Sequence, residues 1–245
     1  MIIDLAREKL KALTDERGMD NELITINCRA LSPEEAIGNP LHDDYPIQLG
    51  KERLIEAEFM GKKGQAFSDS YFHYTGSVKE ILSFRLDTNA RRAIFISSLN
   101  AIMAEIGKMP EALHCKNDDL MRCGETFAGY LDKFAGAAQN VLLVGLQPRL
   151  LEILATRKHV RVCDLNPDNI GTKKCGVTID GPERFAENAR WADAVFATGS
   201  TVVNGTIDSI VKARQDTVFY GVTIAGIARL AGLRQFCHIT GATHA

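Results

Sequence analysis

Hydrophobic and polar positions follow different rhythms in the two halves of the chain. In the first half, apolar residues at helical spacing and alternating, strand-like segments occur in separate groups. Predicted helices cover 2–16, 78–84 and 89–108, with strands at 23–31, 53–60 and 65–69 and a hairpin turn at 61–64. Strands and helices grouped in this way favour an α+β unit with an antiparallel sheet.

In the second half, short apolar strands alternate with helices through brief connections. Predicted strands are 141–145, 160–165, 194–197, 217–223 and 235–240, and predicted helices are 125–135, 149–157, 183–192, 207–214 and 227–232. Regular alternation of this kind predicts a doubly wound parallel sheet of the α/β class. We place the domain boundary near Met109 and Pro110, giving domains 1–109 and 110–245.

Charge and hydropathy argue against nucleic acids and membranes as partners. The formal net charge of the 245 residues is −2, so no basic field favours nucleic acid. The longest apolar runs, such as 141–146, are too short to span a bilayer, and acidic and basic residues interrupt the N-terminus where a signal peptide needs an apolar stretch. We therefore expect a cytoplasmic protein with no membrane partner, and a homodimer on base rates.

The six cysteines indicate a reducing compartment. No two of them form a Cys-x-x-Cys pair, and they are spread over the whole chain. Cys28, Cys163 and Cys237 lie in apolar, strand-like segments, where free cysteine packs as a small hydrophobic residue. The chain is therefore not a disulfide-stabilised secreted domain.

The first strand-to-helix turn of the second half contains Gly145, Gln147 and Pro148, and lacks the second glycine of the dinucleotide-binding pattern. The next strand ends at Asp164, about 20 positions after the first glycine, where nucleotide-binding sheets hold a ribose hydroxyl. S-adenosylmethionine sites use the same arrangement. Asp164 or Asn166 is therefore a candidate ligand contact. The alternative interpretation is a simple turn made by the polar residues before Gly171.

The segment from Thr198 to Thr206 is the stronger candidate. The strand 194–197 ends in small hydroxyl residues around a glycine, and a predicted helix follows. Such a strand end can bind a phosphate or carboxylate through hydroxyl and backbone donors, although the hydroxyls can equally well serve as helix caps. Its candidate ligand residues are Thr198, Gly199, Ser200, Thr201, Asn204 and Thr206.

Other polar residues give weaker signals. His114, Cys115 and Cys123 are candidate soft-metal ligands, but their spacing fits no standard zinc pattern. His42, with the aspartates that follow it, is equally weak. Among the acidic residues, Glu56 and Glu58 share one face of a strand, and we favour a solvated face over a catalytic pair.

Asp69 ends a hairpin strand beside Gln65 and Ser68, in a polar cluster that could reach the second domain. No Gly-x-Ser-x-Gly motif is present, and spacing reveals no Ser-His-Asp triad. The sequence does not decide whether the chain is an enzyme.

Three motifs, taken in order, resemble the putative heavy-metal chelation family, a bacterial and archaeal group of unknown function. They are Gly64-Gln65-Ala66-Phe67-Ser68-Asp69, then Asp164-Leu165-Asn166-Pro167-Asp168, then Thr198-Gly199-Ser200-Thr201 with Asn204-Gly205-Thr206. The resemblance implies an enolase-N-terminal-like α+β domain followed by a Rossmann-like domain. It also implies a site at the domain interface, between the strand ends of the second half and residues 65–69.

Three functions stay open at this stage. The first is binding or conversion of a small, anionic molecule at the interface, linked to metal handling. The metal would be bound directly or through a small chelating molecule. The second is an S-adenosylmethionine- or nucleotide-dependent enzyme, motivated by Asp164. The third is a metal carrier that uses His114, Cys115 and Cys123.

Overall fold

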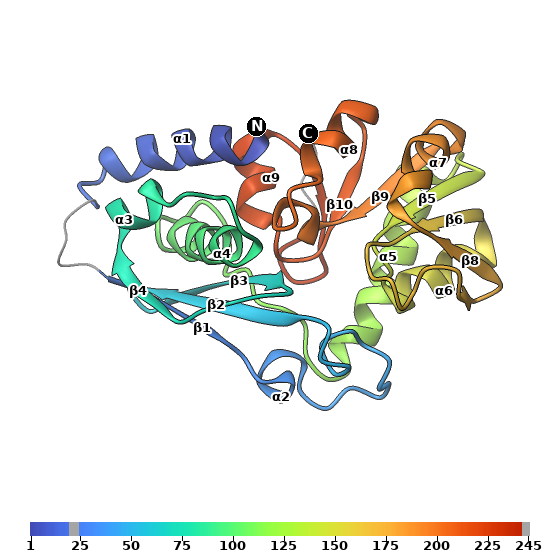
Figure 1. Cartoon of the computed structure of the whole chain (residues 1–245), viewed down its shortest axis with the longest axis horizontal. Coiled ribbons are helices and arrows are strands. Elements are labelled where there is room, and N and C mark those ends of the chain that lie inside the picture. The colour runs from blue at the N-terminus through green and yellow to red at the C-terminus, as the bar shows by residue number, and fades with distance from the viewer. Residues whose placement is uncertain (20–24, 242–245) are drawn as a thin grey trace.

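The computed structural model describes residues 1–19 and 25–241, which form two sheets with helices packed between and around them (Figure 1). The first sheet is antiparallel, in the order β3-β2-β1-β4. Its strands are β1 (Thr25–Ala30), β2 (Arg53–Phe59), β3 (Lys62–Ser68) and β4 (Tyr74–Ser77). The antiparallel α+β expectation for the first half is confirmed, while the predicted strand positions Leu23 and Ile24 lie outside the described residues.

Side-chain caps set the starts of the early helices. The hydroxyls of Ser32 and Ser77 each accept a hydrogen bond from the backbone N–H three residues later. In return, the backbone N–H of each serine donates to the side chain of that later residue, a glutamate, which completes a capping box. The hydroxyl of Thr88 caps the long helix by accepting from the backbone N–H of Arg91. These helices, with the N-terminal one, are α1 (Ile2–Asp15), α2 (Pro33–Ile37), α3 (Val78–Ser83) and α4 (Asn89–Glu105).

The second sheet has the order β11-β10-β9-β5-β6-β8-β7 and is parallel except for β7, which runs antiparallel to β8. Its strands are β5 (Asn140–Val144), β6 (His159–Cys163), β7 (Lys173–Lys174), β8 (Val177–Asp180), β9 (Ala194–Thr198), β10 (Val218–Tyr220) and β11 (Arg234–Phe236). The chain starts in the middle of this sheet and adds strands first on one side of β5 and then on the other. The strand order therefore reverses beside β5, where open α/β sheets bind ligands.

Both faces of the second sheet are buried. Val141 and Leu143 pack into one hydrophobic cluster, and Leu142 between them packs into another on the opposite face. The covering helices are α5 (Asp119–Ala135), α6 (Pro148–Arg157), α7 (Phe185–Trp191), α8 (Ile207–Ala213) and α9 (Ala225–Ala231). The prediction of a doubly wound, mostly parallel sheet is confirmed. Among the described residues, no helix has the length and hydrophobicity needed to cross a membrane.

Helix α4 joins the two halves. A Cβ atom added at Gly64 of β3 would lie 2.4 Å from the Ser97 carbonyl oxygen, so only glycine lets the helix backbone approach the strand this closely. The fully buried Asn100 of α4 bonds to both halves: it donates to the Gln65 carbonyl of β3 (3.0 Å) and accepts from the Gly226 N–H in the second half (2.9 Å). One hydrophobic core runs through both halves, and the division at residues 109 and 110 stays a prediction.

Two sequence predictions need correction. The hairpin turn is tighter than expected, because β3 begins at Lys62 and the turn uses only Met60 and Gly61. The positive φ angles of both turn residues, 51° and 81°, are those of a two-residue turn that suits a twisted hairpin. Strand β4 and the strands β7 and β8 were not predicted, because segments of two to four residues are too short to show a period.

Candidate functional site

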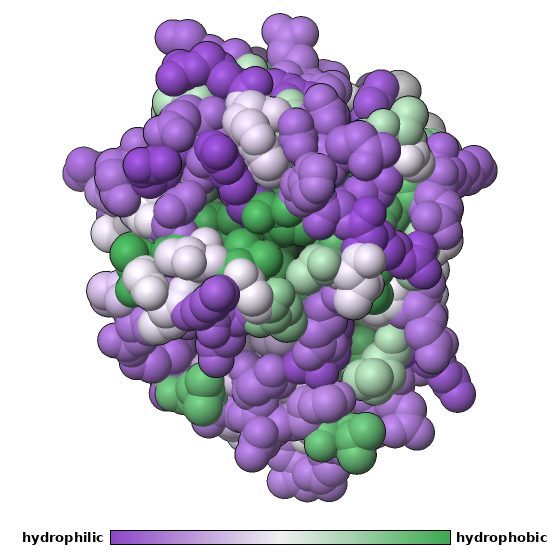
Figure 2. Space-filling view, turned by 90° about the vertical axis from the view of Figure 1, so that its right-hand side faces the viewer, coloured by the Kyte–Doolittle hydropathy of each residue, from purple (hydrophilic) through white to green (hydrophobic). Residues whose placement is uncertain are grey.

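A cavity of about 630 Å³ lies at the carboxyl edge of the second sheet and is walled by residues from both halves. Its size is within the range of small-molecule sites. The loops after β5, β6 and β9 meet there because parallel strands end at the same sheet edge. Figure 2, which views the molecule from the right-hand side of Figure 1, shows a hollow with hydrophobic residues at its floor and hydrophilic residues around it.

The structure brings eleven of the twelve predicted ligand residues to this cavity. They are Asp69, Gly145, Gln147, Asp164, Asn166, Thr198, Gly199, Ser200, Thr201, Asn204 and Thr206. The exception is Gln65, which is 2% exposed and lies behind the cavity wall. Its side chain accepts from the backbone N–H of His114 (2.7 Å) and donates to Glu56 (2.8 Å), so both ends of the amide have protein partners.

Gly145 is required by packing. Its φ angle is +85°, and an added Cβ atom would lie 2.6 Å from Thr198 Cγ2. The Tyr220 hydroxyl donates to the Gly145 carbonyl oxygen at 2.7 Å and fixes the turn further. The backbone of Gly145 is therefore already in contact with β9 and β10, which leaves less reason to interpret it as a pyrophosphate contact.

Asp164 links two loops of the cavity edge. One carboxylate oxygen accepts from the Leu146 N–H (2.6 Å), and the other accepts from the Asn166 N–H (2.7 Å) and from the Asn169 amide (3.3 Å). The carboxylate thus holds the turn after β5 against the turn after β6. This arrangement explains the acidic residue at the strand end without a ribose.

Three amide side chains around the cavity present N–H donors in a fixed orientation. Each uses its oxygen to accept a nearby backbone N–H: Gln147 from Leu150 at 2.6 Å, Asn166 from Asp168 at 3.0 Å and Asn204 from Thr206 at 3.1 Å. Because a backbone N–H needs the oxygen, the NH₂ group must point away from it. Within the described part of the chain, none of these three NH₂ groups has an acceptor.

The hydroxyls of the loop after β9 mostly bond within the loop. Thr201 donates to the Thr198 carbonyl (2.8 Å), and Thr206 donates to Asn204 (2.7 Å). The Thr198 hydroxyl donates to the Ser200 oxygen (3.4 Å), which leaves the Ser200 proton without an acceptor among residues 1–19 and 25–241. Thr198 caps the short 3-10 helix Gly199–Val202 by accepting from the Ser200 N–H (3.3 Å), whereas neither Ser200 nor Thr201 caps a helix. A donor role of this loop toward a ligand stays a prediction.

Asp69 connects the first half to this loop. Its carboxylate accepts from Asn89 (2.8 Å), and the Asn89 oxygen accepts from Arg92 (2.6 Å). Arg92 in turn donates to the Val203 carbonyl. The polar cluster at the end of β3 therefore contacts the second half through this chain of bonds, and Asp69 itself lines the cavity.

Glu52, just before β2, also lines the cavity and was missed by sequence reasoning. Burial, together with the nearby charges of Asp164 and Asp69, raises the pKa of its carboxyl group from 4.5 to about 7. No described residue forms a hydrogen bond or ion pair with this carboxyl group. A partly buried acid without a partner is a candidate for contact with a ligand.

The weak metal candidates His114, Cys115 and Cys123 come together on the cavity wall. Burial lowers the pKa of His114 to about 4, so its ring is neutral at pH 7. The Cys115 thiol donates to Cys123, which lowers the pKa of Cys123 and raises that of Cys115. In the described ranges, no group of three or more His, Cys, Asp or Glu side chains is arranged to hold a metal ion.

Two ion pairs fasten the segment before β2 across the cavity to the second half. Asp44 accepts from the buried Arg149 of α6 at 2.7 Å, and Lys51 pairs with Asp168 after β6. Arg149 also lies over the ring of Tyr45, which lines the cavity. The weak candidate Asp44 therefore has a structural partner, and the segment forms one wall of the site.

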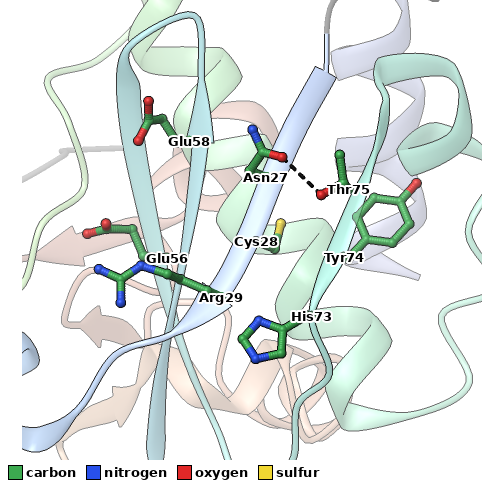
Figure 3. A pocket seen from close by; sticks show the side chains of 8 residues that line it. All are labelled: Asn27, Cys28, Arg29, Glu56, Glu58, His73, Tyr74 and Thr75. Atoms are coloured by element: carbon green, nitrogen blue, oxygen red, sulfur yellow. Dashed lines mark hydrogen bonds between the residues drawn. The ribbon is translucent and has the colours of Figure 1, made fainter.

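A second, smaller hollow of about 350 Å³ lies on the outer face of the antiparallel sheet (Figure 3). Here the polar side chains are either bonded within the protein or exposed to solvent. Asn27 accepts from Thr75 (2.9 Å), and Glu56 accepts from Lys63 (2.9 Å) as well as from Gln65. The expectation of a solvated glutamate face is wrong for Glu56, which is 8% exposed, and correct for the exposed Glu58.

The fold and the cavity define an α/β protein with an antiparallel and a mostly parallel sheet and a ligand-sized cavity where they meet. Residues 133–243 match the model of the family DUF364, described as putative heavy-metal chelation, so the family predicted from the motifs is confirmed in this part of the chain. No curated protein is similar enough to count as a match.

Two solved structures share the fold. One is a DUF364 protein of unknown function from Pyrococcus horikoshii, with 14% identity and a TM-score of 0.53 over 91% of this chain and 80% of that chain. The other is a DUF364 protein of unknown function from Desulfitobacterium hafniense, with 11% identity and a TM-score of 0.50 over 74% of this chain and 72% of that chain. At these identities the likeness supports the fold alone.

Proposed function

We propose that the protein binds a small, metal-chelating molecule in the cavity between the two sheets and takes part in metal handling through it. The observation that carries the proposal is the set of oriented donors from Gln147, Asn166, Asn204 and Ser200 around one cavity. Donors without internal acceptors suit a ligand rich in oxygen acceptors, such as the carboxylates of a chelator.

The family description supplies the link to metal. Because the described side chains form no cluster of three metal ligands, the proposal gives most of the metal coordination to the bound molecule. The Cys115–Cys123 pair supports direct binding of a soft metal as the second candidate, since thiolates prefer such metals. Against a nucleotide-dependent enzyme, Asp164 and Gly145 are already engaged within the protein.

The test is to identify what the purified protein carries, by native mass spectrometry together with elemental analysis. Asn204→Asp keeps the oxygen that caps Thr206 and replaces the NH₂ donor by an acceptor. We expect this variant to lose about 10- to 100-fold in affinity, the value of one hydrogen bond to a charged group. Asn27→Asp makes the same change in the outer hollow and is expected to retain the ligand.

Retention of the ligand by Asn204→Asp at wild-type affinity would contradict the assignment of this donor set. A soft metal bound at one equivalent without any organic molecule, and lost in a Cys115→Ser/Cys123→Ser variant, would favour the second candidate over the first.

A further inference from the structure

The polar groups that face the cavity are divided by chemistry. Around the loops of the second sheet, the groups without internal partners are donors, on Gln147, Asn166, Asn204 and Ser200. On the wall formed by the first half, two groups have no hydrogen-bond partner among the described residues: the carboxyl of Glu52, an acceptor when it is ionised, and the buried hydroxyl of Tyr45. A ligand that satisfies both sides must carry oxygen acceptors and a positively charged group together.

Glu52 is placed so that a positive charge would be favoured beside it. Asp69 and Asp164 line the same cavity, and both are close enough to influence its ionisation. The other ionisable groups nearby are Tyr220, which is bonded to the Gly145 carbonyl, Lys51, which is paired with Asp168, and Arg53, which donates to the backbone carbonyl of Glu52 at 3.1 Å. The cations of Lys51 and Arg53 are therefore already engaged, and the charges that act on the Glu52 carboxyl are those of Asp164 and Asp69.

We propose that the ligand of this cavity is an aminocarboxylate chelator, with its carboxylate oxygens on the amide donors of Gln147, Asn166 and Asn204 and its nitrogen beside Glu52. The inference rests on the proposed function and names the chemical class of its ligand. The nitrogen end of such a molecule is positive in both its metal-free and its metal-loaded form. It carries a proton when metal-free and lies next to the metal cation when loaded.

Ionisation of Glu52 then couples binding to pH. At pH 6 the carboxyl is largely protonated, because burial raises its pKa to about 7, and at pH 8 it is ionised and attracts the nitrogen cation. At intermediate pH, binding of the cation displaces the Glu52 proton to the buffer. Affinity for an aminocarboxylate therefore rises with pH as long as its nitrogen stays protonated.

The test uses iminodiacetate and glutarate in metal-free buffer. These two dicarboxylates have the same length and differ in the central group, which is a protonated nitrogen in one and a methylene in the other. Binding is measured by ligand-observed NMR titration at pH 6 and pH 8. For the wild type we expect a preference for iminodiacetate of about tenfold at pH 8, as for one charge-assisted contact, and a clearly smaller one at pH 6.

Glu52→Gln should bind both probes with little preference at either pH. Glu58→Gln, on the exposed outer face of β2, is the matched control and should behave as the wild type. Equal binding of the two probes by the wild type at pH 8, or an unchanged preference in Glu52→Gln, would overturn the proposal.

A second measurement needs no variant. In protein labelled with ¹³C at glutamate carboxyl groups, one resonance should titrate near pH 7, and its midpoint should fall when iminodiacetate is added but not when glutarate is added. An unchanged midpoint would also count against the inference. If these results hold while no chelator or metal is found with the purified protein, the aminocarboxylate site stands and its metal-handling role falls. If the purified protein instead carries a chelator without nitrogen, the metal-handling role stands and the aminocarboxylate assignment falls.

Discussion

Strand β2 and the residue before it supply carboxylates to two hollows that differ in how those carboxylates are satisfied. In the outer hollow, the buried Glu56 accepts hydrogen bonds from Lys63 and Gln65, and the other carboxylate, Glu58, is exposed to solvent. In the cavity between the sheets, no described residue bonds to the carboxyl of Glu52. A hollow whose polar groups are bonded within the protein or exposed to solvent is explained by folding alone, whereas unpartnered groups that face one cavity need another explanation.

The largest expected effect is that of Glu52→Gln on the pH dependence of stability. The pKa of Glu52 is raised in the folded state, so its contribution is full below about 4.5 and is lost as pH rises through about 7. At about 1.4 kcal/mol for each pH unit, the wild type loses up to about 3 kcal/mol over this interval. The Glu52→Gln variant does not lose this stability, because the glutamine side chain does not ionise.

Urea denaturation at pH 4 and pH 8 measures this effect. The stability of Glu52→Gln relative to the wild type should increase by up to about 3 kcal/mol between the two pH values. The same comparison for Glu58→Gln should show almost no change. A difference for Glu52→Gln that stays constant with pH would mean that the carboxyl is better solvated than its position in the cavity wall indicates.

The second effect is the cost of removing a carboxylate that is fully used. Glu56→Ala leaves the buried NH₂ group of Gln65 without its acceptor, which costs about 1–3 kcal/mol. Lys63→Ala removes the other, more exposed partner of Glu56 and should cost less than about 1 kcal/mol. Chemical denaturation at pH 7 compares the two variants. Equal losses would show that the ion pair, rather than the buried amide, holds Glu56 in place.

The cavity-lining residues that come from the second sheet were easier to predict from the sequence than those from the first half, for a physical reason. Gly145, Asp164 and Thr198 each stand at the end of a parallel strand, and such strands end at one sheet edge. Glu52 has no comparable local signal. It lies in a polar segment, and its position near Asp164 depends on how the first sheet packs against the second.

Local chemistry explains the other differences between sequence and structure. The motif that contains Gln65 and Asp69 was correctly placed near the second half, yet Gln65 lies behind the segment around His114 and cannot face the cavity. The orientation of the Asn166 and Asn204 donors could have been found from the sequence, since asparagine two residues before a turn N–H typically bonds to it, whereas Gln147 is not a usual N-cap residue.

The third effect concerns thiols, which also differ between the two hollows. Cys28 lies beneath the outer hollow with its thiol on the opposite face of β1, 3.5 Å from the Ser98 hydroxyl of α4, and burial raises its pKa to about 11. The pKa of Cys123 is lowered by the hydrogen bond that it accepts from Cys115, so its thiolate is more populated. In a Cys175→Ser background, which removes the exposed thiol, iodoacetamide should modify Cys123 well before Cys28.

Peptide mass mapping over time gives the order of modification. Cys115→Ala removes the donor to Cys123 and should slow its reaction several-fold, while Cys28 should be unaffected. Modification of Cys28 first, or at the same rate as Cys123, would contradict the difference in thiol environment between the two hollows.

The smallest expected effect is that of Glu58→Gln on stability at pH 7. Glu58 lies opposite Lys63 on the neighbouring strand, but it is exposed, so the change should stay within about 0.5 kcal/mol and shrink further at high salt. Glu56→Gln makes the same change of charge two residues earlier, where the side chain is buried. If the two variants differ clearly in chemical denaturation, burial and hydrogen bonding decide the role of each glutamate. If both are neutral, the bonds of Glu56 contribute little, and the contrast between the two hollows depends on Glu52 alone.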